Sequence, residues 1–340
     1  MDVLGLPMPA LRGWLDAIGV GAVHGPGVFR GLHHHMDLER VPNLGRHLDT
    51  IRAHATLATA EIVERHPAPR GVVRLVFRLH DGTRVEGVVL PNPVRPDRAT
   101  LCLSSQVGCA MACRFCATGT LKLTRHLLAG EIVAQTQAVR RELGEGRTLT
   151  HLVFMGMGEP LHNYGPVLEA VRRMQADLGI GARHITLSTV GLAPQIRRFA
   201  DEGLQVTLAI SLHAADDATR RALMPVNKRY PLDELLDAVR YYVERTKRRV
   251  TFEWALIEGE NDTPERAAEL GRLLRGLPCH VNLIPLNPTG GYAGRPSDPE
   301  RVAAFVQGLA DHGIPATVRV RRGIDIDAGC GQLRERYLDV

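Results

Sequence analysis

Apolar residues in the first 55 positions recur at helical spacing. Two sets have this pattern: Leu11, Trp14, Leu15 and Ile18, and then Leu44, Leu48 and Ile51. Steps of three and four residues place such side chains on one face of a helix. We therefore expect residues 1–56 to form a small helical head.

The pattern then changes to β-branched and aromatic runs. Val72–Leu79 and Val85–Leu90 flank Asp81 and Gly82, a dipeptide that favours a tight hairpin turn. The proline-rich stretch Pro91–Pro96 follows. We expect residues 57–97 to form a β-hairpin element and a linker.

From residue 98 to residue 340, strand patterns alternate with helix patterns, which indicates parallel β/α units. The expected strands are Thr100–Ser104, Leu149–Met155, His184–Ser188, Val206–Ser211, Val250–Leu256 and Val281–Pro285, and the longer helices between them are Leu128–Leu143, Val167–Leu178, Leu232–Thr246 and Pro264–Leu274. Six units are too few for a closed eight-stranded barrel, so the predicted fold is α/β, a partial (β/α)6 barrel. Its active site would lie at the carboxyl ends of the strands.

The composition is that of a globular protein, with 44% hydrophobic and 23% charged residues. We find no long uncharged apolar window and no secretion signal, and we expect a cytoplasmic protein without a membrane partner. The net charge of +5 is compatible with a polyanionic partner. Two basic clusters, Lys247–Arg249 and Arg319 with Arg321 and Arg322, could contact phosphates, although each could equally be a solvated face.

Cysteines give the clearest chemical signal. Four of the six lie within fifteen residues, and Cys109, Cys113 and Cys116 form a C-x3-C-x2-C loop after the first barrel strand. Three thiolates can hold three irons of a [4Fe–4S] cluster and leave the fourth iron open. An open iron can chelate the amino and carboxylate groups of S-adenosylmethionine (SAM). A structural zinc site is the alternative, but zinc needs four ligands and no second cysteine pair is visible.

Polar residues follow the other expected strands. Gly156, Gly158 and Glu159 end the second strand, where glycine would let a ligand approach the backbone and Glu159 could receive an ammonium group. Ser188, Ser211, Leu212, His213 and Asn287 follow later strands. Each of these alone is more often a cap or a satisfied polar group, and their shared position at strand ends favours a site.

The cysteine spacing, Phe115 and the β/α units resemble the radical SAM superfamily. Three stretches read together resemble, more narrowly, the RlmN/Cfr family, which methylates an adenine in 23S rRNA: Ala99–Cys109, Met155–Leu161 and Asp325–Leu333. Met224–Lys228 and Asn282–Pro288 extend the resemblance over nearly the whole chain.

The resemblance implies a role for each matching residue. Cys330 would carry a methyl group, Cys102 would release the product, and Glu86 would accept a proton. SAM contacts would fall on Gly158, Glu159, Ser188, Ser211, Leu212, His213 and Asn287. Residues 1–56 would recognise RNA. We assign Cys279 to packing.

The implied chemistry needs two SAM molecules per turnover and an external electron donor. One SAM would methylate Cys330. A second would be cleaved to a radical that takes a hydrogen atom from this methyl group, because a ring carbon of adenine is not nucleophilic. After addition to the ring and loss of a proton, Cys102 would attack the Cys330 sulfur and leave a disulfide.

Four alternatives remain open at this stage. Gly323–Asp327 is similar to Cfr-like members, which modify adenine C8, whereas the N-terminal helices and Gln106–Gly108 are similar to the C2-modifying branch, which we favour. A tRNA adenine is a further candidate substrate. The chain could also be a radical SAM enzyme with a non-RNA substrate, or a non-catalytic RNA-binding module with a structural metal.

Overall fold

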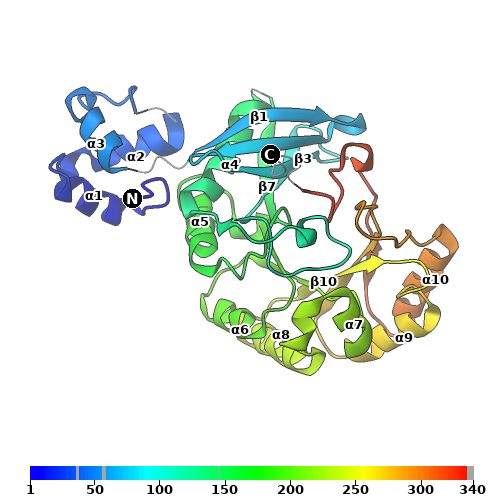
Figure 1. Ribbon diagram of the computed structural model, residues 1–340. Helices are drawn as coiled ribbons and strands as arrows, with labels where there is room; N and C mark the ends of the chain where they lie inside the picture. The colour runs from blue at the N-terminus through cyan, green and yellow to red at the C-terminus, as the bar shows by residue number, and fades with distance from the viewer. Residues whose placement is uncertain (36–37, 56–58, 145, 335–340) are drawn as a thin grey trace.

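The computed structural model describes residues 1–35, 38–55, 59–144 and 146–334. Its centre is one ten-stranded sheet, with the strand order β1-β2-β3-β4-β7-β8-β9-β10-β11-β12 (Figure 1). A separate two-stranded ribbon consists of β5 (Gln106–Val107) and β6 (Arg125–His126). The large sheet agrees with a sequence in which β-branched runs alternate with amphipathic helical stretches.

Parallel strands form the larger part of the sheet. In the described part of the chain they are β4 (Arg98–Cys102), β7 (Thr148–Phe154), β8 (Ile185–Thr189), β9 (Thr207–Ser211), β10 (Val250–Leu256), β11 (Cys279–Pro285) and β12 (Ala316–Val318). The α/β prediction is confirmed, and the six expected strands are present. The short edge strand β12 is an addition, because three residues are too few to give a periodic signal.

The predicted hairpin lies at β2 (Val73–Leu79) and β3 (Arg84–Pro91), but it belongs to the same sheet as the barrel. β3 pairs antiparallel with β4, and β1 (Ala60–Pro67) pairs with β2. Residues 91–96, which we expected to be a linker, instead turn the chain directly from β3 into β4. The Asn92 N–H donates to the Arg98 carbonyl across this turn at 2.8 Å.

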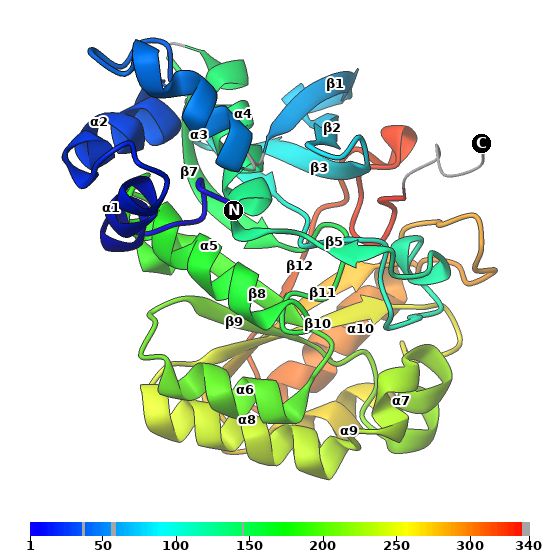
Figure 2. The ribbon, with the colours of Figure 1, turned by 60° about the vertical axis from the view of Figure 1, so that its left-hand side comes forward.

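Helices cover the outer face of the parallel strands (Figures 1 and 2). They are α4 (Ala129–Leu143), α5 (Tyr164–Ala176), α6 (Ala193–Asp201), α7 (Asp217–Leu223), α8 (Leu232–Thr246), α9 (Pro264–Leu273) and α10 (Pro299–Ala310). Strand residues are buried from both sides: on one face of β10, Val250, Phe252 and Trp254 have no exposed surface, and on the other face Glu253 and Ala255 are also buried. Burial on both faces explains why these strands are continuous apolar runs.

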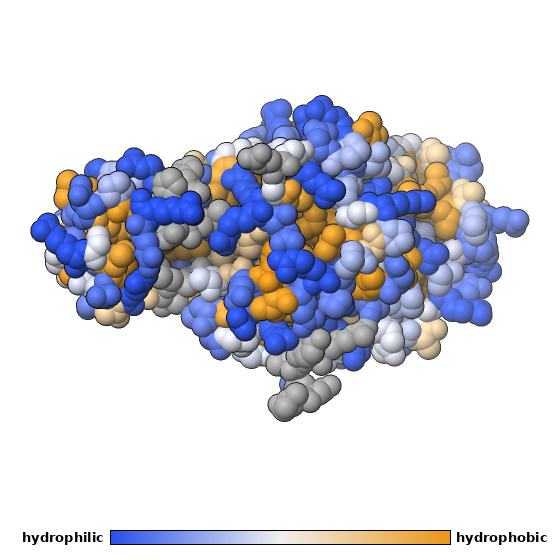
Figure 3. Space-filling view, turned by 90° about the horizontal axis from the view of Figure 1, so that it is seen from above, coloured by the Kyte–Doolittle hydropathy of each residue, from blue (hydrophilic) through white to orange (hydrophobic). Residues whose placement is uncertain are grey.

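The N-terminal helices α1 (Met8–Ala17), α2 (Gly25–Arg30) and α3 (Leu48–His54) form a lobe beside α4 and α5 (Figure 2). Its centre includes Leu11 and Ile51, both fully buried. Hydrophilic residues are spread over both lobes on the face seen from above (Figure 3). Among the described helices, none has the length and apolar character needed to cross a membrane.

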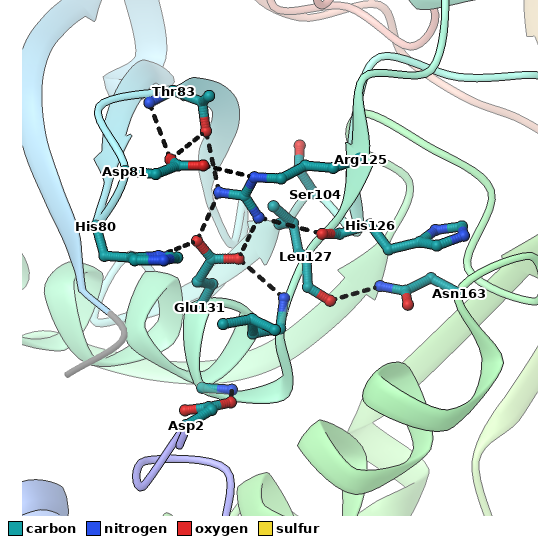
Figure 4. A network of polar contacts seen from close by, with 12 residues as sticks. Asp2, His80, Asp81, Thr83, Ser104, Arg125, His126, Leu127, Glu131 and Asn163 are labelled. Carbon is teal, nitrogen blue, oxygen red and sulfur yellow. Dashed lines mark hydrogen bonds and ion pairs between the residues drawn. The ribbon is translucent and has the colours of Figure 1, made fainter. Parts of the chain in front are cut away.

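A polar network joins the hairpin, the ribbon and α4 (Figure 4). The Arg125 guanidinium donates to Asp81 Oδ2 at 2.7 Å and to both carboxylate oxygens of Glu131 at 2.8 Å. His80 lies 2.8 Å from Glu131. His80, Asp81 and Glu131 are close enough together for a metal site, but the guanidinium already bridges the two carboxylates. The group is therefore an ion-pair network.

Replacing Arg125 with Met should lower the thermal unfolding midpoint, because Glu131 is fully buried and would lose its countercharge. Breaking a buried pair from one side typically costs about 3 kcal/mol. Arg240→Met, which removes an exposed pair with Asp237, should change stability by less than about 0.5 kcal/mol. Equal midpoints for the two variants, measured by circular dichroism, would contradict this account of the network.

Candidate active site

A pocket of about 160 Å³ opens at the carboxyl ends of the parallel strands. Many of the residues predicted from sequence line it together: Cys109, Cys113, Cys116, Gly158, Glu159, Ser188, Ser211, His213, Asn287 and Cys330. A larger cavity of about 670 Å³ lies between the N-terminal lobe, β1 and α4. Its described lining residues include no cysteine and no residue of the motifs, so the smaller pocket is the candidate site.

The cysteine loop is fixed by backbone contacts. The Cys116 N–H donates to the Cys113 carbonyl at 3.2 Å, and the Arg114 N–H donates to Leu223 at 3.0 Å. Gly119 packs against Cys113 so closely that a Cβ would lie 2.5 Å from the Cys113 carbonyl oxygen. Glycine is therefore required there.

Burial raises the pKa of all three loop thiols, that of Cys109 to about 12. A metal centre offsets this cost by binding the thiolates directly. Three sulfur donors on one short loop, facing one pocket, fit an iron–sulfur cluster with an iron that the loop does not ligate.

Glu159 presents a fixed carboxylate to the pocket. Its oxygens accept from the Leu161 N–H at 3.0 Å and from the Val190 N–H at 2.9 Å. Its own N–H donates to Gln106 Oε1 at 2.7 Å. Burial raises the pKa of Glu159 to about 7. A buried carboxylate of this kind is well suited to an ammonium group, which would compensate its desolvation.

His213 lies in the left-handed region, with φ of 58°. Its Nδ1 accepts from the Ala255 N–H at 2.8 Å, which leaves the ring proton on Nε2. Burial, together with the nearby charge of Arg220, lowers the pKa of His213 to about 3. The imidazole is therefore neutral and can donate a hydrogen bond to a ligand.

Arg220, which sequence reasoning did not single out, organises the rim from behind. This fully buried side chain donates to the carbonyls of Val190, Ser211 and Leu212, and to Asn227 Oδ1 at 2.8 Å. The contacts join the ends of β8 and β9. Leu212 does not line the pocket: its N–H donates to the Glu253 carbonyl, and its carbonyl accepts from Arg220.

Asn287 has an unsatisfied acceptor. Its Nδ2 donates to the Cys330 carbonyl at 3.0 Å, whereas its Oδ1 is buried without a hydrogen-bond partner among the described residues. Buried amide oxygens are normally satisfied. Together with the hydroxyls of Ser188 and Ser211 on the same pocket, this oxygen fits a polar ligand such as SAM.

The C-terminal loop holds Cys330 at the pocket. The Ala117 N–H donates to the Gly331 carbonyl at 2.7 Å, and Gln332 Nε2 donates to the Pro288 carbonyl at 2.8 Å. Cys330 keeps an exposed surface, yet the surrounding protein atoms desolvate its thiol enough to raise its pKa. All six cysteines are free thiols.

Cys102 and Glu86 lie behind the pocket lining. Cys102 is the last residue of β4, and the charges of Cys102 and Cys330 influence each other. Glu86 is buried on β3, where it forms an ion pair with Arg74 and accepts from the Arg334 N–H at 2.9 Å. These contacts bind the C-terminal segment to the antiparallel arm, which consists of β1, β2 and β3. Figure 2 shows the segment passing beside β3.

Comparisons with known proteins agree with this geometry. Residues 103–271 match the family model of the Radical SAM superfamily. The chain is 50% identical over 336 residues to "Dual-specificity RNA methyltransferase RlmN 1" of Myxococcus xanthus, covering 97% of this chain and 93% of that protein. It is 43% identical to "Probable dual-specificity RNA methyltransferase RlmN" of Thermosynechococcus vestitus, covering 99% of both.

A crystal structure of a radical SAM methyltransferase from Sphaerobacter thermophilus superposes with a TM-score of 0.92 at 45% identity, covering 98% of this chain and 99% of that one. This chain belongs to the RlmN/Cfr family of radical SAM methyltransferases. Family membership implies an iron–sulfur cluster and SAM, and the pocket described above has the sulfur, carboxylate and amide groups to hold them.

Protein purified without oxygen should contain about four irons and four sulfides per chain, as expected for a cubane with three thiolate ligands. Cys113→Ala should lose the cluster and its visible absorption. Cys279→Ala is the matched control, because Cys279 is buried at the start of β11, away from the pocket. Stoichiometric zinc without sulfide would contradict the assignment.

Proposed function

We propose that this protein methylates the ring carbon C2 of an adenine in 23S rRNA. The methyl group would be carried as an S-methylcysteine on Cys330, and tRNA would be a second substrate. The proposal rests on one observation: the three loop cysteines and Cys330 line the same pocket. The cysteine loop 109–116 comes from the start of the barrel, and Cys330 comes from the end of the chain. No other cysteine outside the loop lines this pocket.

Each part of the site has a proposed task. Cys109, Cys113 and Cys116 would hold a [4Fe–4S] cluster, and Glu159, His213 and Asn287 would orient SAM. When bound, the cluster and SAM supply the radical chemistry that removes a hydrogen atom from a methyl group. The protein would position these groups and exclude water from the pocket. It would also supply Cys330, which carries the methyl carbon, and Cys102, which releases the product.

Cys330 and Cys102 would act in sequence. Cys330 would carry the methyl carbon to the adenine ring and remain bound to it through sulfur. Cys102 would then attack this sulfur, which forms a disulfide and frees the methylated base. Glu86 is the proposed proton acceptor. The ion pair with Arg74 supports an ionised Glu86, although the Glu86 side chain lies outside the pocket lining.

RNA as the substrate is supported by the relatives, whose names describe dual-specificity RNA methyltransferases. The N-terminal lobe is the proposed RNA-recognition part. The basic cluster Lys247–Arg249 precedes β10 and so lies at the opposite end of the parallel strands from the pocket. Phosphate contacts near the target base would instead involve the exposed Arg321 beside the C-terminal loop.

Deleting the gene should remove 2-methyladenosine from 23S rRNA, and from tRNA if the second substrate is correct. Mass spectrometry of nucleosides from purified RNA, with and without the gene, measures this directly. Restoring the gene should restore the modified base, and restoring Cys113→Ala should not. Loss of 8-methyladenosine would instead establish C8 chemistry, and unchanged RNA in both fractions would favour a non-RNA substrate.

The two cysteines should fail at different points. Cys330→Ala should bind RNA but form no covalent bond to it. Cys102→Ala should still carry methyl on Cys330 and still add to adenine, and should then remain attached to the RNA. Denaturing gels with labelled RNA detect the attachment, and peptide mass spectrometry detects S-methylation of Cys330.

The double variant is the control for this experiment, since it should not become attached to RNA. Normal turnover by Cys102→Ala, or Cys102→Ala recovered free of RNA after methyl consumption, would exclude Cys102 as the resolving thiol. The iron content of each variant should equal that of the unaltered protein, because neither cysteine belongs to the cluster loop.

A further inference from the structure

From the sequence we expected that Arg319, like Arg321 and Arg322, could contact phosphates. In the structure its guanidinium instead lies near a buried carboxylate. Arg319 follows β12, and its N–H donates to the Leu283 carbonyl at 2.8 Å, which extends the parallel pairing. About a third of its side chain, 37%, remains exposed. Its Nη1 lies 3.9 Å from Glu253 Oε2 and 3.9 Å from Met155 Sδ.

Glu253 explains this orientation of the guanidinium. Glu253 lies in the middle of β10, lines the pocket and is buried. Its Oε1 accepts from Asn282 Nδ2 at 3.0 Å, and its Oε2 has no hydrogen-bond partner within the described ranges. A buried carboxylate needs a nearby positive charge. Arg319 supplies it, so the guanidinium faces inward.

Met155 connects this charge to the resolving cysteine. The backbone of Met155 makes a hydrogen bond with Cys102, and the side chain of the same residue contacts Arg319. Burial and the neighbouring Cys330 raise the pKa of Cys102, to about 12, whereas the charge of Arg319 acts in the opposite direction and lowers it. Glu253 and Cys330 are in turn within electrostatic range of Arg319.

We propose that Arg319 is a positioning residue for the release step: held by Glu253 and Met155, its guanidinium favours the thiolate of Cys102 that attacks the Cys330 sulfur. The proposal rests on the proposed function of the two cysteines. It assigns Arg319 to a step after the bond to adenine has formed, and not to the binding of RNA.

Release of the methylated base forms one sulfur–sulfur bond and breaks one carbon–sulfur bond. The Cys102 thiolate forms a bond to the Cys330 sulfur, and the bond between this sulfur and the methylene carbon breaks. The electron pair stays on the methylene carbon, which takes a proton from water and becomes the methyl group. The Cys102 thiolate sulfur and the Cys330 thioether sulfur are oxidised to a disulfide, while the methylene carbon is reduced by the same two electrons. A thiolate is required because a neutral thiol is a poor nucleophile.

Arg319→Gln and Arg319→Met test the proposal, and Arg319→Lys tests whether charge alone restores the function. Met retains the apolar stem that packs near Met155 and so preserves the local structure. Iron content, RNA affinity, S-methylation of Cys330, and the amount and lifetime of the covalent RNA adduct would be measured for each. Arg272→Gln, on the exposed face of α9, is the matched control.

We expect the Gln and Met variants to keep the cluster, to bind RNA within about twofold of the unaltered protein and to methylate Cys330. Their adduct should persist longer, by at least about threefold, because loss of the positive charge raises the pKa of Cys102 and so lowers its thiolate fraction. Lys should restore most of the release rate. Arg272→Gln should release product at the normal rate.

Three results would overturn the proposal. Weakened RNA binding without adduct accumulation would show that Arg319 contacts RNA phosphates and does not act in release. Loss of Cys330 methylation would place its action before the RNA step, and normal adduct lifetime in both variants would remove any role in release. If Cys102→Ala gives no adduct in the same assay, the proposed function fails first. If Cys102→Ala accumulates adduct and the Arg319 variants do not, only the role of Arg319 fails.

Discussion

Parallel pairing of the strands from β4 to β12 is the constraint on which the site depends. All carboxyl ends of a parallel sheet meet at one edge, so residues that follow β7, β8, β9 and β11 lie around one pocket although they are distant in sequence. The pairing is stabilised by helices on the outer face and by apolar side chains inside. The site residues themselves contribute little to it, because they are polar and partly desolvated.

Desolvation is the main cost of this site, and the fold compensates it with fixed partners. Glu159 accepts two backbone N–H groups, His213 is held neutral, and Arg220 is surrounded by carbonyl oxygens. Groups satisfied in this way need no reorganisation when a ligand arrives, which is the condition for electrostatic preorganisation. Asn287 Oδ1 and Glu253 Oε2 are the described exceptions on the pocket.

The C-terminal segment completes the pocket by crossing back over the sheet. Arg74 and Glu86 on the antiparallel arm bind it at Ile326 and Arg334, and Asn287 and Ala117 bind the loop that carries Cys330. The antiparallel arm thus supports the loop that carries Cys330 and also extends the sheet. The buried ion pair between Arg74 and Glu86 therefore also holds the C-terminal segment in place.

From the sequence alone we could predict the class of fold, the cysteine loop and many of the polar residues that line the pocket. Cysteine spacing and glycine followed by glutamate are local patterns whose chemistry depends on few neighbours. The sequence did not show that the hairpin joins the barrel sheet, that β1 and β12 exist, or that Leu212 is absent from the described pocket lining. Those features depend on pairing between distant segments, which leaves no local periodicity. For the same reason only the tertiary structure shows that Arg220 contacts the ends of β8 and β9 and that Arg319 lies near Glu253. The sequence gives the charge of a side chain, whereas packing between distant segments decides which groups it contacts.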